Sequence, residues 1–86
     1  MKRGPVKLGN PDVPTRTQLR VLRLMAQHGW GLMAEPNGEC WLYDLDSIRS
    51  IPKVQVSEIV AYRLIVNNWI SGYKLSAKAR AYLEAH

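Results

Sequence analysis

Three stretches of the chain repeat apolar residues at the period of an α-helix. The first, TRTQLRVLRLMAQH, begins at Thr15, which forms a capping-box pattern with Gln18, and Gly29 is a typical helix stop. The other two stretches, EIVAYRLIVNNWI and AKARAYLEAH, follow Ser57 and Ser76, and serine is a favoured N-cap residue. The pattern therefore predicts three capped helices.

Helical wheels assign a face to each of the first two helices. On the first helix, one narrow polar stripe consists of Arg16, Arg20, Arg23 and Gln27. On the second, the side expected to enter the core consists of Ile59, Tyr62, Val66, Trp69 and Ile70, with Ile65 beside them. The opposite side, expected to face solvent, consists of Val60, Arg63, Leu64, Asn67 and Asn68.

Turn residues predict two β-hairpins. The tripeptide PNG at residues 36–38 separates two short apolar runs, which predicts strands over residues 31–35 and 40–44. The dipeptide SG at residues 71–72 predicts a tight turn into a short strand over residues 73–75.

The segment before the second long helix has no clear period. A one-turn helix is expected over residues 47–50, ended by Pro52, because proline disfavours helix in the residue before it. The expected order is then helix, hairpin, short helix, turn, helix, tight hairpin and helix, which is an α+β domain.

Composition limits this plan to one core. With 86 residues and 47% hydrophobic residues, the chain is long enough for a single globular domain. Residues 1–14 hold three of the five prolines and no periodic pattern. We therefore expect a flexible basic arm over residues 1–14 and a folded domain over residues 15–86.

The charge favours an acidic partner. The net charge is +5 and the sequence pI is about 9.7, a balance common in nucleic-acid-binding proteins. The basic residues are concentrated toward the two ends, because residues 31–60 carry two basic and five acidic side chains. An anion-binding surface would therefore be built from the two ends of the chain.

Several classes of function are disfavoured. The chain has one cysteine, Cys40, and two histidines, so neither a disulfide nor the usual four-ligand structural zinc site is expected. No nucleophile has a recognisable partner, so an enzyme is not expected, and no cofactor is implied. The absence of a long apolar run and of a signal-peptide pattern predicts a cytoplasmic protein without a membrane contact.

The runs VSEIVAYRLIVNNWI and YKLSAKARAYLEAH resemble the recognition helix, the wing and the closing helix of the winged helix-turn-helix superfamily. By order of elements the resemblance covers residues 15–86, and by residue pattern residues 45–83. It implies a small winged helix-turn-helix domain, here with an extra β-hairpin after the first helix and a wing reduced to a Ser-Gly turn.

What the resemblance implies about function is binding of double-stranded DNA by a small transcriptional regulator, with a homodimer as one option. The helix after Ser57 would enter the major groove, and the wing and the N-terminal arm would contact the backbone or the minor groove. Carried over to this chain, the DNA-binding residues would be Lys53, Gln55, Ser57, Arg63, Lys74, Lys2 and Arg3.

A second interpretation is a protein-interaction module of winged-helix shape, such as a phage or mobile-element inhibitor or a component of a nucleoprotein complex. Apolar residues next to arginine are typical of protein-binding surfaces. The residues expected to contact a partner protein in this case are Arg16, Arg20, Arg23, Val60, Leu64 and Asn67.

Overall fold

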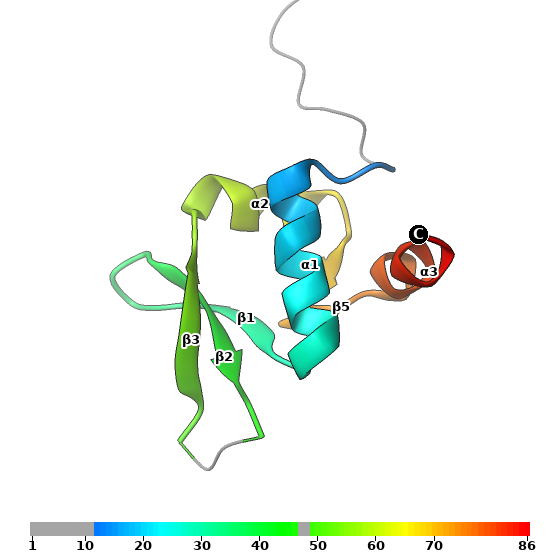
Figure 1. Cartoon of the computed structure of the whole chain (residues 1–86). Coiled ribbons are helices and arrows are strands. Elements are labelled where there is room, and N and C mark those ends of the chain that lie inside the picture. The colour runs from blue at the N-terminus through cyan, green and yellow to red at the C-terminus, as the bar shows by residue number, and fades with distance from the viewer. Residues whose placement is uncertain (1–11, 47–48) are drawn as a thin grey trace, which may run out of the picture.

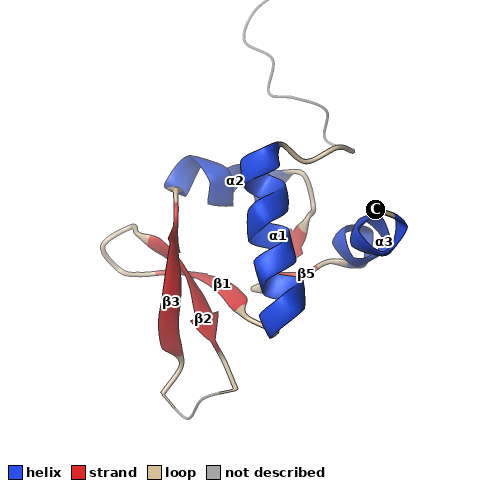
Figure 2. Ribbon diagram, viewed as in Figure 1, coloured by secondary structure: helices blue, strands red, loops and turns tan. Residues whose placement is uncertain are grey.

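The computed structural model describes residues 12–46 and 49–86 and contains helices and two small antiparallel sheets, so this part of the chain is an α+β domain (Figures 1 and 2). In chain order the elements are α1 (Arg16–His28), β1 (Gly31–Ala34), β2 (Cys40–Asp44), β3 (Ile51–Val56), α2 (Glu58–Val66), β4 (Ile70–Ser71), β5 (Lys74–Leu75) and α3 (Ala77–Ala85). Helix α1 contacts α2, α3 and β5. In Figure 1 it stands between the three-stranded sheet on the left and α3 on the right.

The larger sheet has the order β1-β2-β3, and all its strands are antiparallel. Leu42 in the central strand pairs with Leu32 in β1 and Val54 in β3, so the apolar positions of the sheet are in register. The smaller hairpin, β4 with β5, is tied to the first sheet because the Leu32 N–H donates to the carbonyl of Tyr73 at 2.8 Å. Both predicted hairpins are confirmed, but the turn of the second lies at Gly72 and Tyr73 rather than at Ser71 and Gly72, and its return strand begins at Lys74.

The ends of α1 are as the sequence predicts. The Gln18 N–H donates to Oγ1 of Thr15 at 3.2 Å, and the Thr15 N–H donates to Oε1 of Gln18 at 3.1 Å, which completes the capping box. Gly29 adopts a left-handed conformation with φ of 72° and donates its N–H to the carbonyl of Met25. Local sequence therefore determines the bounds of this helix.

The expected one-turn helix before α2 is wrong where the structure describes it. Residues 47 and 48 lie outside the described residues, Arg49 lies in a turn, Ser50 has a left-handed backbone with φ of 51°, and β3 follows directly. Proline is tolerated in β3 because this strand is the edge of its sheet, where a missing N–H breaks no ladder. Alternation places Val54 and Val56 inward and leaves the intervening Gln55 exposed.

The predicted faces of α2 are also wrong. The helix ends at Val66 rather than Ile70, because Asn68 adopts a left-handed conformation with φ of 65° and turns the chain. Trp69 and Ile70 do reach the core, but they do so from the β4 hairpin and not from the helix. Trp69 and Ile70 are therefore not part of the helix, and the side of α2 that faces the core is the side of Ala61 and Leu64.

One cluster of buried apolar side chains joins all three helices to both sheets. Leu64 and Leu22 are completely buried at its centre, as is Leu42 from the sheet. The full cluster is Val21, Leu22, Met25, Leu32, Leu42, Val56, Ala61, Leu64, Trp69, Ile70 and Ala79. Burial of these side chains is the main source of the stability of the fold.

Candidate functional site

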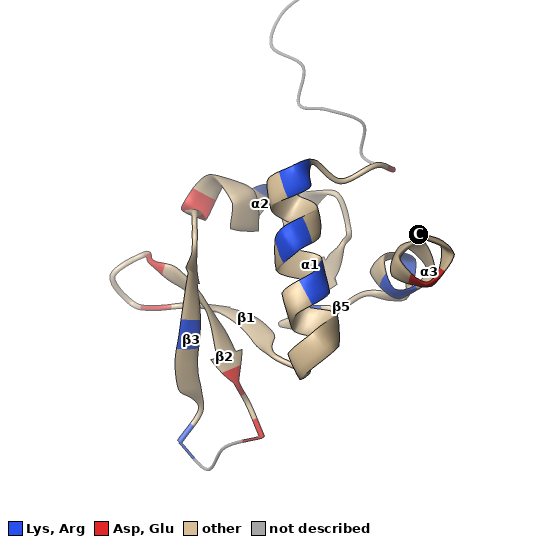
Figure 3. Cartoon of the chain, viewed as in Figure 1, with Lys and Arg blue, Asp and Glu red and all other residues tan. Residues whose placement is uncertain are grey.

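The first candidate surface is the exposed edge of α1. Arg16, Arg20 and Arg23 are all exposed, one turn apart, and the helix contains no acidic residue (Figure 3). They line a shallow groove together with Leu19, Leu24 and Gln27. Among the described residues, none of these arginines forms an ion pair. Within the described residues, the groove is therefore a cationic surface.

Strand β3 extends this surface. A second, smaller cavity brings Arg20 and Thr17 of α1 together with Gln55 and Ser57. Lys53 is exposed two residues before Gln55 and so lies on the same side of the strand. Lys53 and Gln55, which are both predicted to contact DNA, therefore lie on β3 rather than along α2, and Gln55 lies next to α1.

Along α2 the structure brings two of the predicted contact residues, Arg63 and Asn67, to one groove, and it does not add Val60 or Leu64 to them. Leu64 has 0% exposure, which overturns its place in a protein-binding patch. Val60 and Arg63 are half-buried, and the half-buried Asn67 accepts a hydrogen bond from Lys78 through its carbonyl. Arg63 is then the one basic residue of the helix.

Two other predicted DNA contacts have structural partners. The Ser57 hydroxyl caps α2 by accepting from the Val60 N–H at 3.5 Å, and Nζ of Lys74 donates to the carbonyl of Gly29 at 3.1 Å. Lys2 and Arg3 lie outside the described residues. Of the predicted arm, residues 12–14 are described: Asp12 and Val13 are exposed, and Pro14 is buried.

The second candidate surface is the side of α2 that faces solvent. It consists of Ile59, Tyr62, Ile65 and Val66, which are 51 to 66% exposed. We call these residues the apolar face of α2. Ile59, Tyr62 and Val66 line one groove with the polar residues Glu58, Arg63 and Asn67. The other large exposed apolar side chains come from different segments, namely Val13, Met33, Ile51 and Tyr73.

The sequence pattern predicts that this face enters the core, which is wrong. The error arises because α2 is apolar on every side, so periodicity does not orient it. A signal was present in the sequence: two consecutive asparagines precede Trp69, and asparagine tolerates the left-handed conformation that ends a helix.

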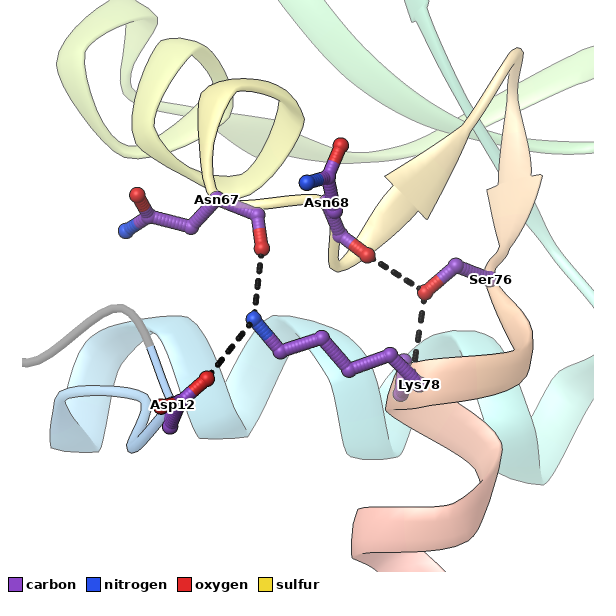
Figure 4. Close-up of polar contacts among 6 residues, drawn as sticks. Asp12, Asn67, Asn68, Ser76 and Lys78 are labelled. Carbon is purple, nitrogen blue, oxygen red and sulfur yellow. Dashed lines mark hydrogen bonds and ion pairs between the residues drawn. The ribbon is translucent and has the colours of Figure 1, made fainter.

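A polar network fixes the end of α2 relative to α3 (Figure 4). Nζ of Lys78 donates to the Asn67 carbonyl at 2.8 Å and lies 3.5 Å from the Asp12 carboxylate. The Ser76 hydroxyl caps α3 and donates to the Asn68 carbonyl at 2.6 Å. The carbonyls of Asn67 and Asn68, which directly follow α2, are therefore bonded to side chains at the start of α3, and this ties the end of α2 to α3.

Cys40 lies beside the start of α2. It lines a cavity with Gln55, Ser57 and Glu58, and burial, then the negative charge of Glu58, raises the pKa of its thiol. A thiol with a raised pKa is a poor nucleophile at neutral pH. No three His, Cys, Asp or Glu side chains in the part of the chain that the structure describes lie close enough to hold a metal ion.

No helix within residues 12–46 and 49–86 combines the length and the apolar character that crossing a membrane requires. No protein-family model, curated protein or solved structure matches this chain significantly. Its function is therefore inferred from the two surfaces of its own helices.

Proposed function

We propose that this chain is a small DNA-binding protein of winged-helix type that contacts duplex DNA through the arginine edge of α1. The observation that carries the proposal is the groove lined by Arg16, Arg20 and Arg23, without an acidic residue in it. Guanidinium groups bind phosphate in a planar, bidentate manner and retain their charge at any physiological pH. The net charge of +5 favours approach to a polyanion.

The relation to a winged helix rests on α1, α2, the β4–β5 hairpin and α3, which follow one another in the expected order. Strand β3 stands where a helix-turn-helix has its first helix, and α2 turns apolar side chains outward. Base edges in the major groove are read mainly by Arg, Lys, Asn and Gln. For this reason we assign the DNA contact to α1 and β3 rather than to α2.

The proposed mechanism is attachment to the DNA backbone. Each of the three arginines neutralises about one phosphate and releases its condensed counterion, so binding weakens as salt rises. Gln55, next to Arg20 in the shared cavity, is the side chain suited to hydrogen-bond a base edge. Such a protein would act as a small transcriptional regulator by occupying a short stretch of duplex.

A second candidate function is protein interaction, and the apolar face of α2 favours it. Contiguous exposed apolar side chains on one short helix are typical of protein-binding surfaces. In this function the phage-inhibitor or nucleoprotein-complex interpretation would use Ile59 and Tyr62 in place of the buried Leu64.

The test is fluorescence anisotropy with a labelled random-sequence duplex at several salt concentrations. We expect a slope of log K against log salt of about −3, from three phosphate contacts. Arg20→Glu should weaken binding about tenfold or more, equivalent to about 1.4 kcal/mol. Arg80→Glu on α3 is the matched control, because it makes the same charge change at another exposed arginine.

Equal losses from Arg20→Glu and Arg80→Glu would mean that only the net charge matters, which contradicts a defined site. If Arg63→Glu weakened DNA binding and Arg20→Glu did not, the DNA contact would lie on α2. No binding at low salt would end the DNA proposal and leave protein interaction as the remaining candidate.

A further inference from the structure

The apolar face of α2 is a surface without a partner in the part of the chain that the structure describes. Its four side chains are 51 to 66% exposed, although Leu64 on the opposite side of the same helix is fully buried. The face is held in place by the contacts of Lys78 and Ser76 with the end of α2. It is a fixed surface rather than a fraying helix end.

The size of this face suits association with a second copy. Four large side chains with this exposure leave on the order of 500 Å² of mainly apolar surface, comparable to the largest patch on a typical monomer. Two such faces, with the polar residues at their borders, would bury about 1,200 Å², which is the lower end of specific protein interfaces. The expected complex is therefore a weak dimer.

The order of residues along α2 also suits a two-fold axis. When two copies of α2 pack antiparallel about an axis between Tyr62 and Arg63, Ile59 of one copy lies at the height of Val66 of the other, on the same side of the contact. The two Tyr62 rings meet beside the axis, where aromatic rings stack favourably. Two-fold interfaces require this kind of self-complementarity.

The charges on the face agree with the antiparallel arrangement. The groove that this face lines has one acidic residue, Glu58, at its start and one basic residue, Arg63, near its middle, so the groove is neutral within a chain of net charge +5. In an antiparallel pair the two Glu58 carboxylates lie at opposite ends of the contact, whereas a parallel pair would bring them together. Antiparallel helices also have opposed dipoles.

From these observations we infer that the chain forms a two-fold dimer through the apolar face of α2, with Tyr62 at the axis. The dimer leaves the arginine edges of α1 uncovered, since Arg16, Arg20 and Arg23 lie on another helix. In this dimer, the protein partner of the apolar face of α2 is a second copy of the chain. The inference does not depend on DNA binding.

The test is the mass of the full chain in solution without DNA, measured by sedimentation equilibrium over a range of concentrations. We expect the mass to rise from one chain toward two as concentration increases. Tyr62→Glu should raise the dissociation constant by about 30-fold or more, as expected for an aromatic residue at the centre of an interface. Tyr73→Glu is the matched control, because Tyr73 is an exposed tyrosine (50%, against 66% for Tyr62) that lies outside the apolar face, and this variant should dimerise like the wild type.

A second measurement does not depend on how the Tyr62 variant folds. In a Cys40→Ser background, Tyr62→Cys should form an intermolecular disulfide under mild copper-phenanthroline oxidation, whereas Ile65→Cys should not. The two copies of residue 65 would lie too far apart across the axis for a disulfide, which needs Cα atoms within about 7 Å. Equal crosslinking at both positions would contradict the antiparallel arrangement.

A chain that remains monomeric up to about 1 mM, the range of the weakest specific complexes, would overturn the dimer. That result would leave the DNA proposal standing, because anisotropy with duplex is measured separately. If a photo-reactive residue at position 62 then captured a different protein in the native cells, the second candidate function would survive without the dimer. If it captured no protein, that function would be contradicted as well.

Discussion

Helix α1 exposes arginines along one edge, whereas helix α2 exposes isoleucine, tyrosine and valine. Both helices contribute buried apolar side chains to the same core, so the fold alone does not require this difference. A solvent-facing helix side without a partner would be expected to be polar. The contrast agrees with the two proposed partners, a polyanion at α1 and an apolar protein surface at α2.

The largest expected effect separates the two sides of α2. Leu64→Ala should lower the free energy of unfolding by about 3 kcal/mol, because it leaves a cavity in the core. Ile65→Ala, one residue away but 51% exposed, should change it by about 0.5 kcal/mol or less. Urea unfolding followed by circular dichroism checks both, at a protein concentration low enough to keep the chain monomeric. Similar losses for the two variants would mean that the orientation of α2 is different.

The next effect concerns the arginine edge of α1. In the triple variant Arg16→Ala, Arg20→Ala and Arg23→Ala, the slope of log K against log salt should fall from about −3 to near zero. The dimer dissociation constant should stay within about threefold of the wild type, because these residues lie outside the apolar face of α2. Anisotropy and sedimentation on the same variant check both. If the triple variant lost the dimer but still bound DNA, the dimer contact would lie on α1 and the DNA contact elsewhere.

A smaller effect compares the caps of the two helices. Thr15→Ala removes a reciprocal capping box and should lower the free energy of unfolding by about 1 to 2 kcal/mol. Ser57→Ala removes a single hydrogen bond of 3.5 Å and should lower it by about 0.5 kcal/mol. Thermal unfolding of the two variants gives the comparison. A larger loss for Ser57→Ala would show that the start of α2 depends on this residue more than the long hydrogen bond indicates.

The smallest effect probes the charge at the start of α2. Burial, and then Glu58, raise the pKa of the Cys40 thiol, so less thiolate is present at neutral pH and alkylation should be slower than for free cysteine. Glu58→Gln removes the repulsion, lowers this pKa and should increase the rate with iodoacetamide about twofold to threefold at pH 8. A rate that is unchanged or slower in Glu58→Gln would contradict the electrostatic contribution.

Local signals in the sequence predict much of the fold. Thr15 and Gly29 bound α1, and Ser57 and Ser76 mark the starts of the other two helices, because capping depends on residues close in the chain. The two hairpins follow from their turn residues for the same reason. Local signals do not predict strand β3, because its pairing with β2 is not local and Pro52 is typical of a helix stop.

The candidate site was predicted only in part. The arginine stripe follows from periodicity alone, since α1 has one polar side. The orientation of α2 depends on where the helix ends, and the ending at Asn67 and Asn68 moves Trp69 and Ile70 onto a hairpin. For a helix that is apolar on all sides, tertiary packing rather than sequence pattern decides which side remains exposed.

The measurement that tests the two-surface interpretation most directly is an NMR titration of the ¹⁵N-labelled chain with a random-sequence duplex at low salt. We expect the largest amide shift changes along the arginine edge of α1 and at Gln55, with Ile59 to Val66 unaffected by DNA. In the same sample without DNA, dilution should shift Ile59 to Val66 and leave α1 unchanged. Shifts concentrated on α2 upon addition of DNA, with none at Arg16, Arg20 or Arg23, would contradict the assignment of the two helices.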